Sequence, residues 1–350
     1  MKHRLLGGLA PRAFLRRHWQ KRPLFVPGAL PQFRGMRGEA ADLRALLALA
    51  ARDDVESRIV ERRGSRWDTV HGPFKSVACA KRNFTLLVSG VNLHARAADA
   101  LLRRFSFVPQ ARLDDVMVSY ATPGGGVGPH VDSYDVFLLQ GPGRRRWKVW
   151  LPDRKTIEYV AGPGDLLYLP PGLRHDGVAL EPCFTYSIGF RAPRGAELSA
   201  AFLDWLHERG LPDARYRDPG LAPAASPARI PREMVAFCSD LLRRIRWTER
   251  EVGDFLGRDL TEPQPHVGFR PSAGRGPVVA LDPKTQLLYS GARFFINGEA
   301  FSAGKRAAAL LRELADRRCI AAARLAGTPL PGLISRWVRS GYARRHGGAD

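Results

Sequence analysis

The chain has 350 residues, of which 45% are hydrophobic and 25% are charged. This composition excludes an intrinsically disordered chain, and the length allows two or three packed domains. No apolar run reaches the roughly 20 residues of a membrane span, and the basic start lacks the apolar core of a secretory signal. We therefore expect a cytoplasmic protein without membrane contact.

The net charge of +21 comes from 55 basic and 34 acidic residues. Such a balance can attract nucleic acid. Nearly all of the positive charge is arginine, however, in a chain rich in alanine and glycine. Genomic base composition is an alternative origin for this usage, so the charge alone does not define a partner. The four cysteines form no CxxC pair, and we expect them to be reduced.

Residues 44–60 and 92–105 have helical spacing and predict helices that, with additional strands, support the barrel-like region that follows. From about residue 112 to 192, runs rich in Val, Ile, Phe and Tyr alternate with Gly/Pro turns. This pattern predicts antiparallel strands in a sandwich or barrel. The runs are 114–126, 135–143, 144–153, 164–172 and 184–193.

After Pro193, amphipathic helices are predicted over 196–210 and 231–247, with a Pro/Ala-rich connector between them. Their apolar stripes exceed what a connector needs to bury, so we expect a homodimer through these helices. Packing against the barrel alone is the alternative. The stripes contain Phe202, Trp205, Leu206, Met234, Phe237, Leu241 and Leu242.

From about residue 265 the pattern predicts a small unit of helices and strands. A turn at "NGE", residues 297–299, separates two of the strand-like runs. Residues 305–318 and 331–345 have helical spacing. Together they are typical of a helix-and-wing unit.

A metal site is indicated by His130 and Asp132, because side chains two apart on a strand face the same side. An HxD pair alone is common. The second half is "PGDLLYLPPGLRH", in which Gly164, Pro170 and His175 have the spacing found in cupin barrels. Two imidazoles and one carboxylate leave coordination positions free, as in non-haem Fe(II) oxygenases. A structural or vestigial cupin is the alternative.

The segment "GPGRRRWKVW" raises the possibility of an arginine inside the barrel. If it pairs with the preceding strand across "QGPG", Arg145 shares one face with Trp147 and Val149, and the flanking basic residues face outward. A buried guanidinium needs an anionic partner. A dicarboxylate cosubstrate would supply one, and Asp165 is the alternative partner within the chain.

If "LDDVMVSY" is a strand, the alternation of side chains places Asp115, Met117 and Ser119 on one face. Ser119 could donate to a cosubstrate carboxylate, and Asp115 could meet a cationic substrate. An ordinary salt bridge of Asp115 is equally compatible with the spacing. The glycine run 124–128 lacks a following GK[ST], which argues against a phosphate loop and favours a flexible turn at the barrel mouth.

At this point the sequence resembles the bacterial ribosomal oxygenases of the JmjC/cupin class, specifically those that hydroxylate an arginine of large-subunit ribosomal protein sixteen. The resemblance covers most of residues 15–195. It implies an α+β fold with a double-stranded β-helix, the cupin/JmjC barrel. The domains it implies are a catalytic domain over 1–195, a helical dimerisation region over 196–262 and a winged-helix-like domain over 263–350. The segments that carry it are "RHWQKRPLFV", "HGPF", "PGGGVGPHVDSYDVFLLQGPGRRRW", "PGDLLYLPPGLRH" and "YSIGFRAP".

The resemblance further implies a protein arginine hydroxylase, a dioxygenase that uses Fe(II), 2-oxoglutarate and O2 on a ribosomal protein. A metal-binding cupin without oxygenase activity, or a nucleic-acid-binding regulator with an inactive barrel, are the alternatives. By motif position the resemblance assigns three roles: the catalytic metal ligands His130, Asp132 and His175; the 2-oxoglutarate residues Arg145 and Ser119; and the substrate residues Asp115, Met117, Tyr134 and Ser187.

The charge of the C-terminal unit departs from the family that the sequence resembles. Residues 266–350 carry 14 Lys/Arg and 5 Asp/Glu, a net charge of +9. A nucleic-acid contact by this unit is therefore left open.

Overall fold

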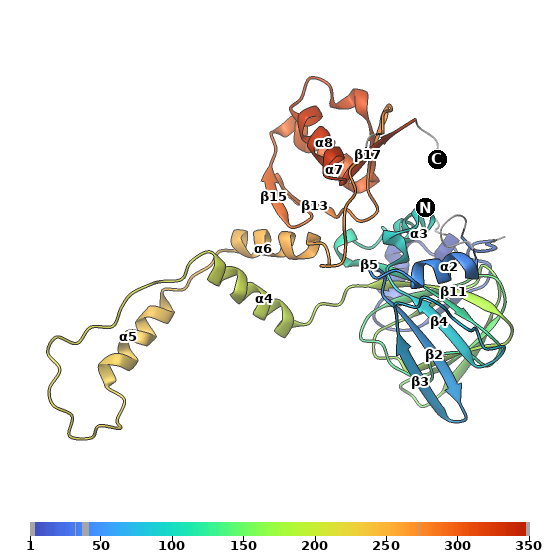
Figure 1. Ribbon diagram of the computed structural model, residues 1–350, viewed down its shortest axis with the longest axis horizontal. Coiled ribbons are helices and arrows are strands. Elements are labelled where there is room, and N and C mark those ends of the chain that lie inside the picture. The colour runs from blue at the N-terminus through green and yellow to red at the C-terminus, as the bar shows by residue number, and fades with distance from the viewer. Residues whose placement is uncertain (1–3, 32, 37–41, 273, 348–350) are drawn as a thin grey trace.

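The computed structural model describes residues 4–31, 33–36, 42–272 and 274–347. Figure 1 shows a β-rich domain, two helices on an extended arm, and a C-terminal unit above them. None of the described helices combines the length and apolar character needed to cross a membrane.

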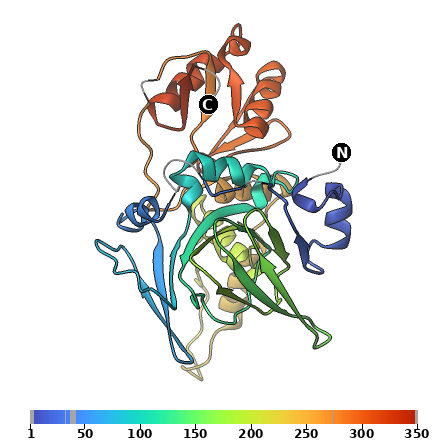
Figure 2. The ribbon, with the colours of Figure 1, turned by 90° about the vertical axis from the view of Figure 1, so that its right-hand side faces the viewer.

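The N-terminal domain contains two antiparallel sheets. The larger has the order β1-β9-β6-β11-β5-β4-β2-β3, and the smaller has the order β10-β7-β8. Figure 2 shows their strands side by side below the C-terminal unit. The larger sheet consists of β1 (Leu24–Val26), β2 (Ser57–Arg63), β3 (Arg66–His71), β4 (Phe84–Val88), β5 (Leu113–Ala121), β6 (Val136–Gln140), β9 (Leu166–Leu169) and β11 (Cys183–Phe190). The smaller consists of β7 (Arg145–Trp150), β8 (Thr156–Ala161) and β10 (His175–Ala179).

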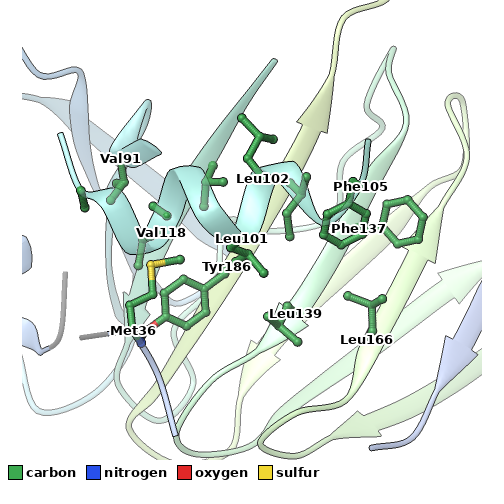
Figure 3. Packing of buried hydrophobic residues seen from close by; sticks show 14 of the residues in the cluster. Met36, Val91, Leu101, Leu102, Phe105, Val118, Phe137, Leu139, Leu166 and Tyr186 are labelled. Carbon is green, nitrogen blue, oxygen red and sulfur yellow. Dashed lines mark hydrogen bonds between the residues drawn. The ribbon is translucent and has the colours of Figure 1, made fainter. Parts of the chain in front are cut away.

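Strand β6 is buried on both faces, which explains its continuous apolar run. Val136 and Leu138 pack in a cluster with residues of the smaller sheet, including Trp147. Phe137 and Leu139 point the other way, into the main core. Helices cover that outer face: α1 (Pro11–Arg17), α2 (Leu43–Ala50) and α3 (Arg96–Arg103). Figure 3 shows Leu101 and Leu102 of α3 above Phe137 and Leu139.

The predicted double-stranded β-helix is confirmed, with two local corrections. The predicted helix over 44–60 ends at Ala50, and β2 begins at Ser57. The segment with Arg145 does not pair with β6 across "QGPG"; β7 pairs with β8 and β10. The reason is that β9 and β11 already occupy both hydrogen-bonding edges of β6.

The arm contains α4 (Gly195–Glu208) and α5 (Arg232–Arg243), and α6 (Glu249–Thr261) follows. Part of the α4 stripe packs within the chain: the ring centroids of Phe202 and Phe255 of α6 lie 5.2 Å apart, and Leu206 is buried. In contrast, α5 has no buried residue. Figure 1 shows α5 held away from the rest of the molecule.

The C-terminal unit joins small sheets to two helices. The Asn297-Gly298 turn lies between β14 and β15, with left-handed φ angles of 47° and 86°, as a two-residue hairpin turn requires. The elements are β12 (Val278–Leu281), β13 (Leu287–Ser290), β14 (Arg293–Ile296), β15 (Glu299–Ser302), α7 (Lys305–Arg317), β16 (Cys319–Ala321), α8 (Leu330–Arg339) and β17 (Ala343–His346).

Helix α6 packs against this unit as well as against α4. The Arg293 guanidinium donates to both carboxylate oxygens of Asp254, at 2.9 and 2.6 Å. The Thr261 hydroxyl accepts from the Gly298 amide at 3.1 Å. The domain boundaries at 195 and 262 remain predictions, and α6 has contacts on both sides of the second.

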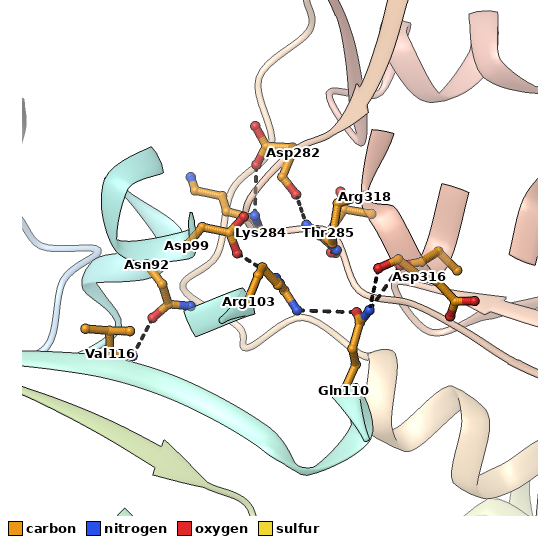
Figure 4. Close-up of polar contacts among 11 residues, drawn as sticks. Asn92, Asp99, Arg103, Gln110, Val116, Asp282, Lys284, Thr285, Asp316 and Arg318 are labelled. Atoms are coloured by element: carbon orange, nitrogen blue, oxygen red, sulfur yellow. Dashed lines mark hydrogen bonds and ion pairs between the residues drawn. The ribbon is translucent and has the colours of Figure 1, made fainter. Parts of the chain in front are cut away.

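Polar contacts hold the C-terminal unit against the barrel (Figure 4). The Gln110 side chain donates to the carbonyl oxygens of Ala315 and Asp316 at 3.2 and 3.3 Å. Arg103 of α3 donates to Asp99 at 3.0 Å and to Gln110 at 3.4 Å. The C-terminal unit is therefore docked beside the end of the barrel at which β5 begins.

Candidate active site

The two histidines of the predicted metal site lie opposite each other in a backbone bridge. The His130 amide donates to the His175 carbonyl at 3.0 Å, and the reverse bond is 2.9 Å long. Asp132 lies beyond the bridge and outside any strand, where its carbonyl accepts from Gly172 at 2.8 Å. The prediction that a strand would place both His130 and Asp132 is wrong, but their side chains do converge.

The three ligand atoms lie within 4.8 Å of one another. Asp132 carboxylate oxygens lie 3.8 Å from His130 Nε2 and 3.6 Å from His175 Nε2. Each Nδ1 is 2.9 Å from a backbone carbonyl oxygen, of Gly128 and Leu173 respectively. Donation from Nδ1 leaves Nε2 free as a ligand atom. Burial lowers the pKa of His175, which favours the neutral form that binds metals.

A cavity of about 670 Å³ surrounds this triad. Its wall follows the inner face of β5, where the predicted parity is confirmed: the valines at 116 and 118 point into the main core instead. On β7 only Arg145 and its apolar companions face inward. All nine predicted site residues line the cavity: Asp115, Met117, Ser119, His130, Asp132, Tyr134, Arg145, His175 and Ser187.

Arg145 has the environment expected of an anion-binding residue. It is only 5% exposed, and its Nε and Nη2 atoms lack a hydrogen-bond partner in the described part of the chain. Its guanidinium lies 5.6 Å from the centroid of the Trp147 ring. Asp165 accepts instead from the amides of Gly28 and Gly162, both at 2.8 Å. The alternative pairing of Arg145 with Asp165 is therefore not found.

Thr85 is a cavity residue that the sequence analysis missed. It is fully buried on β4, and its hydroxyl also lacks a partner among the described residues. Strand register places Leu87 of β4 opposite Ser119 of β5, so Thr85 and Ser119 share the inner face. A lone hydroxyl in the apolar run "FTLLV" was the available signal. The cavity also contains Glu56, Arg58 and His71 from β3 and the start of β2, which no motif indicated.

Asp115 lies in the cavity wall with one backbone partner, the Gly90 amide at 2.9 Å from its Oδ2. Burial raises its pKa to about 6. The ion pairs found in the described ranges do not include Asp115, so the salt-bridge alternative is not observed. Tyr134 is 39% exposed, and burial raises its pKa to about 12, so its phenol stays protonated at neutral pH.

The glycine run before the triad packs closely rather than forming an open turn. A Cβ on Gly125 would collide with the Phe84 backbone, and one on Gly126 with the Gly177 backbone. Gly128, with φ of 81°, lies against the Trp67 ring. The run therefore lets the chain pass between two strands and reach the bridge at His130.

Comparison with known proteins defines the class. Residues 100–198 match the JmjC domain, and residues 244–344 match a ROXA-like winged helix. The fold and the His-Asp-His site thus define a JmjC-domain protein with a C-terminal winged helix.

Proteins of similar sequence identify the family within this class. The chain is 38% identical to the ribosomal protein uL16 3-hydroxylase of Escherichia coli, covering 72% of this chain and 74% of that protein. It is 36% identical to a probable ribosomal oxygenase of Haemophilus influenzae, covering 54% of this chain and 52% of that protein. The chain therefore belongs to the ribosomal oxygenase family.

Comparison with solved structures supports the same family. The ribosomal oxygenase YcfD of Escherichia coli matches with a TM-score of 0.80 and 34% identity, over 97% of this chain and 98% of that chain. A structure of YcfD with cobalt and 2-oxoglutarate matches with a TM-score of 0.80 and 33% identity, over 96% of this chain and 98% of that chain.

Proposed function

We propose that the protein is a 2-oxoglutarate-dependent dioxygenase that hydroxylates an arginine side chain of a large-subunit ribosomal protein. The observation that carries this proposal is the single cavity that unites a His-Asp-His triad with a buried, unpartnered arginine. The related uL16 3-hydroxylase supports the ribosomal substrate. Such a substrate also supports a cytoplasmic location.

We assign Fe(II) as the metal, held by His130, Asp132 and His175. Two imidazoles and one carboxylate suit Fe(II) and leave positions for a bidentate ligand and oxygen. Fe(II), 2-oxoglutarate and O2 together supply the oxidation of an unactivated C–H bond, with succinate and CO2 as co-products. The backbone bonds to both Nδ1 atoms keep the ligand nitrogens directed at one point.

The cosubstrate is held at its far end by Arg145, Ser119 and Thr85. The free Nε and Nη2 of Arg145 can donate in parallel to one carboxylate, which is the geometry that guanidinium and carboxylate favour. The hydroxyls of Thr85 and Ser119 add neutral donors from the facing wall. A carboxylate here would meet the unsatisfied donors of Arg145 and Thr85, and the Ser119 hydroxyl would exchange its 3.5 Å bond to the Thr185 carbonyl.

The target arginine is held by Asp115, Tyr134, Met117 and Ser187. The Asp115 carboxylate pairs with the guanidinium, and the Tyr134 ring stacks on its plane. The Met117 and Ser187 side chains come from cross-strand partners and line the channel for the aliphatic stem. This arrangement favours oxidation of an aliphatic carbon, since the charged end is anchored away from the metal.

We further propose that α5 makes a homodimer. Val235 and Leu242 are 54% and 65% exposed on a helix that buries none of its own residues. A second copy of the arm would cover this stripe.

The function is tested by mass spectrometry of ribosomal proteins from cells with and without this enzyme. The expected result is a +16 Da shift on one arginine that depends on the enzyme. The same shift on histidine would overturn the arginine assignment. Succinate release that requires Fe(II) separates an oxygenase from a cupin that only binds metal.

A further inference from the structure

Two stretches of the C-terminal unit contain no acidic residue. The first lies between Glu262 and Asp282, and the second between Asp316 and Asp350. The second is rich in arginine, and the first contributes two more. They hold Arg270 and Arg275 in the first, and Arg317, Arg318, Arg324, Arg336, Arg339, Arg344 and Arg345 in the second.

The fold brings these two stretches together. The Ser272 amide donates to the Val338 carbonyl of α8 at 3.1 Å. The Phe269 and Tyr342 rings pack with centroids 4.8 Å apart. A Cβ on Gly341 would collide with the backbone of Arg270. The first stretch therefore runs along the end of α8 and the turn that follows it.

The contact continues along β17. A Cβ on Gly274 would collide with the Arg345 carbonyl, and one on Gly276 with the His346 backbone. Arg345 also pairs with Val279 in the β12–β17 ladder. Five arginines thus share one region, here called the basic surface: Arg270, Arg275, Arg336, Arg339 and Arg345.

The side chains of this surface are available to a partner. Arg270, Arg275, Arg336 and Arg339 are exposed, and the ion pairs of the described residues include none of them. Arg317 and Arg324 contrast with them, because both pair with Glu313. Helix-dipole stabilisation at the end of α8 accounts for two of the five arginines at most.

The basic surface begins near a second cavity that adjoins the active site. This cavity of about 330 Å³ separates the barrel from the C-terminal unit and shares Glu56, Ser89 and Asp115 with the active-site cavity. Val267 lines this second cavity. Three residues of extended chain span at most about 11 Å, so Arg270 begins within that distance of Val267.

We propose that the basic surface binds the phosphate backbone of structured RNA. This rests on the proposed function, because the substrate proposed there is a ribosomal protein, whose natural partner is ribosomal RNA. The second cavity differs in charge from the basic surface. It is lined by five carboxylates, of which Asp54 and Asp114 pair with arginines, and by two cations, Arg191 and Lys284. The excess of carboxylates favours a basic protein chain there. The arginines of the basic surface lie in stretches without acidic residues and favour a polyanion such as RNA.

The test measures binding of a fluorescent 20-base-pair RNA hairpin to the full-length protein at several salt concentrations. Arg336→Glu/Arg339→Glu should weaken binding about tenfold or more at 100 mM salt. The slope of log affinity against log salt should fall by about 1.5 to 2, because two phosphate contacts are lost. The matched control is Arg12→Glu/Arg16→Glu, two exposed arginines of α1, which should bind RNA like the parent.

Hydroxylation of an isolated substrate peptide serves as the check on folding and on the proposed function. Arg336→Glu/Arg339→Glu should hydroxylate the peptide at the parental rate, and Arg336→Gln/Arg339→Gln provides a milder variant if the double reversal fails to fold. Equal RNA affinity in the parent and both α8 variants would overturn the proposal. Tighter binding of a DNA hairpin than of RNA would overturn the assignment to RNA. If the α8 variants lose RNA binding but neither the parent nor any variant hydroxylates the peptide, the RNA proposal stands and the proposed arginine hydroxylase activity is refuted.

Discussion

Asp132 is the only carboxylate of the triad and lies between its two imidazoles. Asp132→Ala should abolish hydroxylation, because two neutral histidines bind a divalent metal weakly. It should leave the fold intact, with a Tm within a few degrees of the parent. Succinate release and thermal unfolding measure both effects. Asp153→Ala, an exposed carboxylate of the same domain paired with Lys155, is the control. Turnover by Asp132→Ala would contradict the triad.

The buried guanidinium of Arg145 is unpaired when no cosubstrate is bound. Arg145→Met should therefore raise the Tm of the free protein, because it removes uncompensated polar atoms from an apolar wall. It should also raise the KM for 2-oxoglutarate at least about a hundredfold, since a charge-assisted contact is lost. Calorimetric scans with and without 2-oxoglutarate, together with steady-state kinetics, measure these effects.

Arg144→Met and Arg146→Met are the matched controls, because both side chains flank Arg145 in the sequence and are exposed. Both should keep the parental KM for 2-oxoglutarate. A large effect at either position would show that the inward assignment of Arg145 is wrong.

The pKa of Asp115 is about 6 in the folded protein, raised by burial from 3.8. The folded state therefore binds this proton more tightly than the unfolded state does. Its contribution to stability is fully present below about pH 4 and is lost as the pH rises through 6. Asp115→Asn lacks this loss and should be more stable than the parent above pH 6, by at most about 3 kcal/mol. Denaturant unfolding at pH 4 and pH 7.5 measures the difference.

The same substitution tests the substrate role. Asp115→Asn should reduce peptide hydroxylation far more than uncoupled 2-oxoglutarate decarboxylation, because only the peptide needs the carboxylate. Equal loss of both activities would indicate that Asp115 supports the metal site or the fold.

At the scale of elements, two glycines of α6 have opposite surroundings. A Cβ on Gly257 would lie 2.5 Å from the Phe295 ring, whereas one on Gly253 meets nothing within 4 Å. Gly257→Ala should therefore destabilise the packing of α6 on β14, typically by about 1–3 kcal/mol. Gly253→Ala is its control and should stabilise the helix by about 0.5–1 kcal/mol. Thermal unfolding of the full chain distinguishes them, and equal shifts would contradict the close packing of α6.

At the scale of the whole molecule, the exposed stripe of α5 predicts the oligomeric state. Val235→Glu/Leu242→Glu should convert a dimer into a monomer, because two charges would be buried without partners. Light scattering after gel filtration measures the mass. Arg232→Glu/Arg244→Glu changes charge on the same helix and should leave the dimer intact. A monomeric parent at micromolar concentration would contradict the dimer.

The sequence by itself predicted the kind of fold and nine residues that line the cavity. Strand periodicity determined which residues of β5 share a face and which side of β7 faces inward, because alternation along a strand is a local property of the backbone. The spacing of Gly164, Pro170 and His175 indicated the cupin barrel, and the turn at 297–299 indicated a hairpin. These features depend on neighbours within about ten residues.

The tertiary structure decided what depends on distant contacts. Only the two-sheet arrangement shows that β7 pairs with β10 and not with β6. Which strands occupy the two edges of a given strand is a property of the whole sheet. Only packing shows that Thr85 shares the cavity with Arg145. Only packing shows that part of the apolar stripe of α4 is covered by α6. The basic surface exists because residues 270–272 and 274–276 lie against 338–346, since arginines of separate stretches form one charged face only when the chain brings them together.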